Sequence, residues 1–255
     1  MIGALMFLGC PIRMILRLGG GDLNALFGIA GFAGGIGFGT IFLKKGYSLQ
    51  RTYALSKLES AMMPAIQVGL LVLVVTAPAF IFFSQKGPGA MHAPWLISLA
   101  AGLVVGGLSQ FSRLCTVGGF RDLFLFKKSI LIFGYLAVLI GVFVVNISFG
   151  NFHLGFENQP IAHTDGLWNF LGMALAGFCS VLLGGCPLRQ LIMTGEGNSD
   201  SAVTVLGLGA GAAFAHNFGL AASGAGPTLN GEIAVGVGFV VALIIAVVNT
   251  KCANA

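Results

Sequence analysis

A Gly-Cys-Pro-x-Arg step occurs twice in the chain, and its residue types suit the binding of an anion. The first copy lies in GCPIRMILRLGGGD at residues 9–22 and the second in GCPLRQLIMTGEG at residues 185–197. Pro11 and Pro187 fix their own φ and lack the amide hydrogen that a first helical turn leaves unpaired, so each predicts the start of a short helix. The preceding cysteine then lies at a helix N-terminus, where free amides and the helix dipole favour negative charge.

Cys10 and Cys186 are therefore candidate contacts for an anionic, sulfur-like substrate. Arg13 and Arg189 follow three residues after these cysteines, near enough to neutralise a substrate charge or a carboxylate. The alternative for each arginine is that it snorkels to the membrane interface. Glycines favour an early helix end in both copies. Because about ten helical residues cannot cross a bilayer, each copy predicts a re-entrant half-helix that dips in and returns.

A third stretch, SRLCTVGGFRD at residues 112–122, combines a cysteine with glycines in another order. Cys115 is its candidate substrate contact, and Gly119 and Arg121 are supporting candidates. Arg121 precedes Asp122, and an ion pair between them would fix the loop, although a solvated loop is the open alternative. Nothing in the three stretches predicts a catalytic residue.

One further residue, His216, interrupts the apolar run 202–222. Ionisable groups at membrane depth usually face the protein interior or a cavity, so His216 is a supporting candidate, with an interhelical hydrogen bond as the alternative. Cys179 and Cys252 have no proline or glycine turn beside them and are interpreted as small apolar residues.

The elements that must position these residues are membrane-spanning helices. The chain has 255 residues, of which 56% are hydrophobic and 8% charged, whereas a soluble domain carries about 25% charged residues. Apolar runs long enough to cross a bilayer lie near 23–43, 62–83, 94–111, 129–147, 166–184, 202–222 and 233–249, with a short apolar start at 1–8. We predict an all-α, polytopic membrane protein: one transport domain over 1–255 with about seven full transmembrane helices and short re-entrant half-helices.

The distribution of charge predicts which connections face the cytoplasm. The connections 44–61 and 112–128 are basic, whereas 148–165 has no Lys or Arg, so the first two and Lys251 are predicted to be cytoplasmic. The loops 84–93, 148–165 and 223–232 then face outside. The first Gly-Cys-Pro step falls on the outer side and the second on the inner side, which predicts an inverted repeat relating 9–22 to 185–200.

Other classes of site find no support in the sequence. The net charge of +5 is confined to short connections, which does not indicate nucleic-acid binding. The five cysteines form no CxxC pair and are odd in number, so they predict neither a disulfide framework nor a zinc site. No metal and no cofactor are expected.

The motifs resemble those of the YeeE/YedE family of membrane proteins, most closely its branch associated with selenium metabolism. The resemblance covers essentially the whole chain and is carried by residues 9–26, 82–103, 112–126, 156–173 and 184–207. It implies a permease of the bacterial plasma (inner) membrane whose short helices meet at a constriction. There thiosulfate or a selenium compound would pass between S–H groups, here Cys10, Cys115 and Cys186. Members of this branch begin with a further upstream span and cysteine motif, so the resemblance also implies that the N-terminal part is lacking.

Three functions follow as hypotheses. The first is a permease in the lipid bilayer for a small sulfur- or selenium-containing anion, because neutral thiols can hold a soft anion weakly at several sites. The second is a membrane thiol enzyme that hands sulfur or selenium to a soluble carrier protein through a persulfide, with Cys115 as its thiol. The third is a Cu(I) transporter that uses the thiols with Met14 and Met193.

Overall fold

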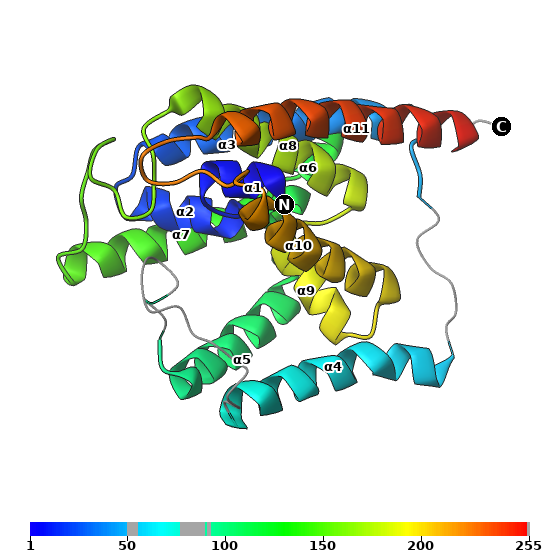
Figure 1. Ribbon diagram of the computed structural model, residues 1–255, viewed down its shortest axis with the longest axis horizontal. Helices are drawn as coiled ribbons and strands as arrows, with labels where there is room; N and C mark the ends of the chain where they lie inside the picture. The colour runs from blue at the N-terminus through cyan, green and yellow to red at the C-terminus, as the bar shows by residue number, and fades with distance from the viewer. Residues whose placement is uncertain (50–55, 77–89, 91–92, 254–255) are drawn as a thin grey trace. The chain divides into compact units, whose positions relative to one another are not determined.

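The computed structural model describes residues 1–49, 56–76, 90 and 93–253, and over this range the chain is helical without a named β-strand (Figure 1). Two compact units are distinguished. One contains residues 1–50, 114–189 and 206–255, and the other 51–113 and 190–205. The helices are α1 (Ile2–Phe7), α2 (Pro11–Gly19), α3 (Asn24–Lys44), α4 (Lys57–Thr76), α5 (Trp95–Ser112), α6 (Thr116–Phe126), α7 (Ile130–Ser148), α8 (Gly166–Leu183), α9 (Pro187–Gly195), α10 (Ser199–Asn217) and α11 (Leu229–Ala253).

Six helical segments of the described residues are long and apolar enough to cross a membrane. They are Ile2–Gly19, Asn24–Lys44, Trp95–Phe126, Ile130–Ser148, Gly166–Gly195 and Leu229–Thr250. The fold class is confirmed: this is an all-helical, multi-pass membrane protein. Five of the seven predicted spans coincide with parts of these segments, three of them beginning one residue earlier.

Two predicted spans are not among the six. The run 62–83 is described only as a shorter apolar helix, Ala61–Thr76, and its end and most of the loop 84–93 lie outside the described residues. The run 202–222 ends as a helix at Asn217, and its Gly, Ala, His and Asn residues keep its hydropathy low. The short start 1–8 instead joins α2 in the segment Ile2–Gly19.

The first unit is built around the pair α3 and α8, with α11 lying alongside α8 (Figure 1). Glycines explain how α3 and α8 approach so closely. Gly31 and Gly35 lie against the backbone carbonyls of Phe170 and Ala174, where a Cβ would overlap the oxygen. Gly177 makes the reciprocal approach from α8 to α3. In a membrane, helix pairs depend on such close packing because burial from water contributes little between helices.

Three breaks in the helices share one local conformation. Leu8, Arg113 and Gly184 adopt positive φ angles of 61°, 52° and 85°. Each lies two residues before a cysteine of the candidate site, and a short helix follows that cysteine. These helices, α2, α6 and α9, have 9, 11 and 9 residues, or about 14 to 17 Å, and cannot cross the bilayer alone.

The second unit carries α4 and α5, and both expose apolar side chains along their length, as lipid-facing helices do. The Gln110 side-chain amide, near the end of α5, donates a hydrogen bond to the Glu196 carboxylate in the turn after α9. This contact ties the two sequence segments of the second unit together.

Candidate functional site

The structure brings Cys115 and Cys186 into direct contact. Their thiols lie next to each other, and both side chains belong to the same buried core cluster. Cys115 is 9% exposed and Cys186 is 1% exposed. Two cysteines that lie 71 residues apart in the sequence therefore meet in the protein interior, at the starts of α6 and α9.

Both sulfurs cap their short helices. The Gly118 amide donates to Cys115 Sγ at 3.3 Å, and the Arg189 amide donates to Cys186 Sγ. In each helix the donor is the third residue after the cysteine, the usual position for a side-chain N-cap. The prediction that Cys10 and Cys186 stand at the N-terminal edges of short helices is confirmed, and Cys115 takes the same position in α6.

Two hydroxyl groups beside these thiols lack hydrogen-bond partners. Both the backbone and the side chain of Thr116 lie near Cys186. The buried Thr116 hydroxyl has no hydrogen-bond partner. The buried Tyr135 hydroxyl has no partner either, and Tyr135 belongs to the core cluster that contains Cys115 and Cys186. Buried polar groups are nearly always satisfied, so these two unpaired hydroxyls are candidate contacts for a ligand or a water molecule.

Aromatic packing holds Tyr135 in place. Its ring meets Phe120 edge-to-face at a centroid distance of 5.8 Å, and Phe120 meets Phe32 in the same way at 5.9 Å. The hydroxyl therefore projects from a fixed ring, which lowers the cost of orienting it toward a ligand.

Cys10 stands at the N-cap of α2, with Pro11 as the first helical residue, as predicted. It differs from the other two cysteines because its side chain makes no capping hydrogen bond. It is partly buried and lies near enough to Tyr135 for an electrostatic interaction. Cys10 is not among the residues of the core cluster that holds Cys115 and Cys186, so the structure brings together two of the three predicted thiols.

Three of the supporting candidates, Pro187, Gly119 and Arg121, lie in the short helices α9 and α6. Pro187 opens α9 as predicted, and Gly119 is buried where α6 approaches Ile132 of α7. Arg121 pairs with Asp122 at 2.9 Å, confirming the predicted ion pair, but the pair belongs to α6, so the expectation of a loop there is wrong. The position of these charges in a basic connection suggested a loop; in the structure Gly118 and Gly119 let α6 pack against α7.

Arg189 contributes its backbone amide to the thiol pair. His216, in contrast, is exposed in the last turn of α10, and among the described residues no contact links it to the three thiols. Cys179 belongs to a different core cluster, in agreement with its interpretation as a packing residue. The side chain of Cys252 lies outside the described residues.

Sequence reasoning missed a buried arginine clamp next to Cys10. Arg17 Nε donates to Asp22 Oδ2 at 2.6 Å, and the two side chains are 5% and 3% exposed. Arg17 Nη1 donates to the Phe7 carbonyl at 2.6 Å, and the guanidinium lies 4.1 Å from the centroid of the Phe7 ring. The clamp therefore connects the end of α1, just before the break at Leu8, to the glycine turn after α2.

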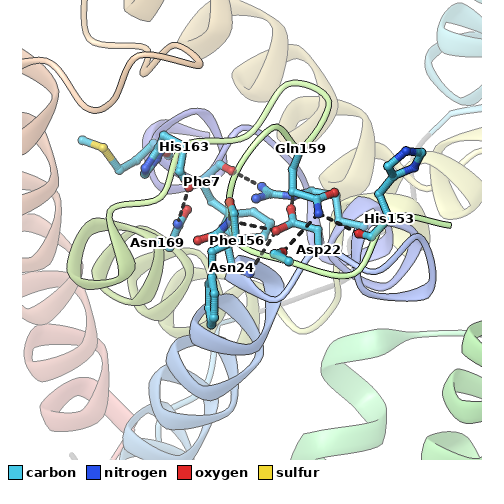
Figure 2. A network of polar contacts seen from close by, with 11 residues as sticks. Phe7, Asp22, Asn24, His153, Phe156, Gln159, His163 and Asn169 are labelled. Atoms are coloured by element: carbon cyan, nitrogen blue, oxygen red, sulfur yellow. Dashed lines mark hydrogen bonds and ion pairs between the residues drawn. The ribbon is translucent and has the colours of Figure 1, made fainter. Parts of the chain in front are cut away.

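A loop of residues 149–165 fastens this clamp from the other side (Figure 2). Asn24 donates to Asp22 Oδ1 at 2.9 Å and to the Phe156 carbonyl at 2.7 Å. His163 Nε2 contacts the Met6 carbonyl at 2.8 Å. Only the turn glycines and the spacing from Arg17 to Asp22 signalled this network, and neither pointed to the distant loop.

Among the described residues, no group of three His, Cys, Asp or Glu side chains is placed to hold a metal ion.

Comparison with known proteins gives one match. A family model described as sulphur transport matches residues 111–251, which include Cys115, Cys186 and Tyr135. No curated protein and no solved structure matches the chain. Because the match covers more than half of the chain, and because the fold is that of a multi-pass membrane protein, the chain belongs to the sulphur transport family, the YeeE/YedE proteins.

Proposed function

We propose that the protein is a permease for a small sulfur- or selenium-containing anion, which passes Cys10, Cys115 and Cys186 in turn. The observation that carries the proposal is the pair of buried, unpaired hydroxyls of Thr116 and Tyr135 next to the thiol pair. A buried donor without a partner destabilises the protein by about 1–3 kcal/mol. An anion held there would accept from these donors and remove that penalty.

The weak hydrogen-bond donors of this site favour the passage of an anion over its tight binding. Thiols are weak donors, and in this proposal the ion meets three of them in turn. A conducted ion must bind well enough to enter and weakly enough to leave. Hydroxyls at Thr116 and Tyr135 would hold the oxygen atoms of an oxyanion, while the thiols would face its softer sulfur or selenium atom.

The finer features of the proposal come from the resemblance and the charge pattern. The cargo would be thiosulfate or a selenium compound, and the location the bacterial inner membrane. The segments 9–22 and 185–200 would enter from opposite faces as an inverted repeat, and a soluble carrier would collect the cargo in the cytoplasm. Direct sulfur transfer to that carrier would need an accessible thiol, so the burial of Cys115 and Cys186 favours passage.

Uptake by reconstituted vesicles tests the proposal. We expect Cys115→Ala and Cys186→Ala each to lower the uptake of labelled thiosulfate or selenium oxyanion by about 10-fold or more. The reason is that a hydrogen bond to a charged group contributes roughly 1.5–3 kcal/mol, and 1.4 kcal/mol is about tenfold. Cys10→Ala should act in the same direction. Cys179→Ala is the matched control because it removes a thiol from another cluster and should leave uptake unchanged.

The Tyr135→Phe variant gives a second test in the same assay, because it removes one oxygen atom and keeps the ring. Uptake should fall, whereas thermal stability should stay equal or rise, since the lost hydroxyl has no partner in the folded protein. If Tyr135 had only a structural role, the variant would lose thermal stability together with uptake. The proposal would be contradicted if uptake stayed at the unsubstituted level in the Tyr135 variant and in all three cysteine variants.

A further inference from the structure

A pocket of about 560 Å³ lies beside α2, apart from the thiols. It is bounded by α2, by Asn146 of α7 and by the loop residues 151–160. We propose that this pocket is an oxyanion-binding vestibule that collects the substrate before it reaches the thiols. The inference rests on the proposed function and adds to it a second binding site of different chemistry.

The α2 wall of the pocket is a single helix face. Arg13, Leu16, Arg17 and Gly20 line it, at the spacings of three and four residues that place side chains on one side of a helix. The neighbouring Met14 and Ile15 are buried in the core cluster that contains Cys115 and Cys186. One short helix therefore presents a cationic face to the pocket and an apolar face to the thiol cluster.

The pocket has a surplus of positive charge, and its source is Arg13. Arg17 is paired with Asp22, whose carboxylate also accepts from Asn24. No carboxylate pairs with Arg13 among the described residues, and its buried Nε has no partner. Glu157, an exposed residue of the same loop, is not part of the lining.

Arg13 is also held toward the first cysteine. Its stem lies against Gly9, where a Cβ would come within 2.8 Å of Arg13 Cδ. Arg13 follows Cys10 by three residues, or about 4.5 Å along the helix axis. An anion paired with Arg13 would therefore be within about one helical turn of the first thiol, while Arg13 remains on the pocket face.

Backbone hydrogen bonds fix the opposite wall. The amides of His153 and Gly155 donate to the carbonyls of Gly20 and Gly21 at 2.9 and 3.0 Å. The Gln159 side chain donates to the carbonyls of His153 and Gly155 (Figure 2). These contacts form the pocket before a ligand arrives, which reduces the entropy lost on binding.

The polar groups that line the pocket are guanidinium, imidazole and carboxamide groups and the carboxylate of Asp22, which is paired with Arg17. Arginine and amide N–H groups bind the oxygen atoms of oxyanions, and nothing in the lining selects for sulfur or selenium. The volume exceeds that of several water molecules, at about 30 Å³ each, so the anion would enter partly hydrated. We therefore expect sulfate to compete with thiosulfate in the vestibule, with selection left to the thiols.

Equilibrium binding of labelled thiosulfate to the purified full-length chain tests the vestibule. In a Cys186→Ala background, which weakens the thiol site, binding should persist and unlabelled sulfate should displace it. Adding Arg13→Gln should weaken that binding at least 10-fold, with Arg13→Lys in between. Asn158→Asp, an exposed change that adds negative charge to the lining, should also weaken it, whereas Glu157→Gln, outside the lining, should not.

The outcomes separate the two proposals. Loss of all thiosulfate binding in Cys186→Ala alone would overturn the vestibule and leave the thiol site standing. Undiminished binding after both Arg13→Gln and Asn158→Asp would overturn the vestibule as well, and Asn158→Asp keeps this test valid if the arginine variant fails to fold. Normal uptake by the cysteine variants would instead contradict the proposed function, whatever the vestibule binds.

Discussion

Arg17→Met is expected to lower the free energy of unfolding by about 3–5 kcal/mol, the usual cost of removing one partner from a buried ion pair. The Asp22 side chain, only 3% exposed, would lose its ion pair and keep the hydrogen bonds from the Asn24 amides. The Phe7 carbonyl would lose its donor too, which loosens the break before Cys10. Unfolding of the purified protein, followed by intrinsic fluorescence in denaturant, measures the effect.

The double variant Arg17→Met with Asp22→Asn is the control. It removes the second charge as well, and replacing both members of a buried pair is much less costly than removing one. Stability should therefore recover in part. A single Arg17→Met variant as stable as the unsubstituted protein would show that the clamp does not hold the first break.

Gly35→Val is expected to prevent α3 and α8 from packing. The added side chain would overlap the Ala174 carbonyl oxygen, and a backbone atom in the middle of a helix cannot move aside as a side chain can. Overpacking usually costs about 1–3 kcal/mol, and here the whole helix pair must separate, so we expect the upper end or loss of the folded protein. The monodisperse yield in detergent and the thermal unfolding midpoint report the change.

Gly34→Ala is the matched control on the same helix. Its Cβ would lie 3.9 Å from the nearest atom, Phe170 Cζ, in ordinary contact. The variant should be as stable as the unsubstituted protein or slightly more stable, because alanine favours a helix over glycine. Equal tolerance of Gly34→Ala and Gly35→Val would contradict the packing described for α3 and α8.

Local chemistry made part of the site predictable from the sequence. Proline predicts a helix start whatever surrounds it, and Pro11 and Pro187 do begin α2 and α9. The cysteine before each proline is then placed by the same rule. The sequence also predicted that Arg121 would pair with Asp122, because neighbours in the chain need no tertiary structure to meet.

The remaining features depend on contacts between distant segments. Tyr135 lies in an apolar run, and nothing in the sequence marks it as a site residue. Its candidate role depends on Cys186 and Phe120, which the fold brings close to it. Arg17 was not predicted as a site residue, because the sequence does not show that its ion pair with Asp22 is buried. The segment of α6 was interpreted as a loop because its charges lie in a basic connection, whereas packing against α7 stabilises it as a helix.

Cross-linking of Cys115 to Cys186 tests most directly whether the anion passes between these thiols. In vesicles containing a Cys179→Ala/Cys252→Ala chain, copper–phenanthroline with oxygen would oxidise Cys115 and Cys186 to a disulfide, which mass spectrometry distinguishes from a link to Cys10. We predict that the link forms, that thiosulfate uptake falls from its measured unlinked level to that of empty vesicles, and that dithiothreitol restores it. Failure of the link to form, or a linked chain that transports at the unlinked rate, would contradict a path between the two thiols.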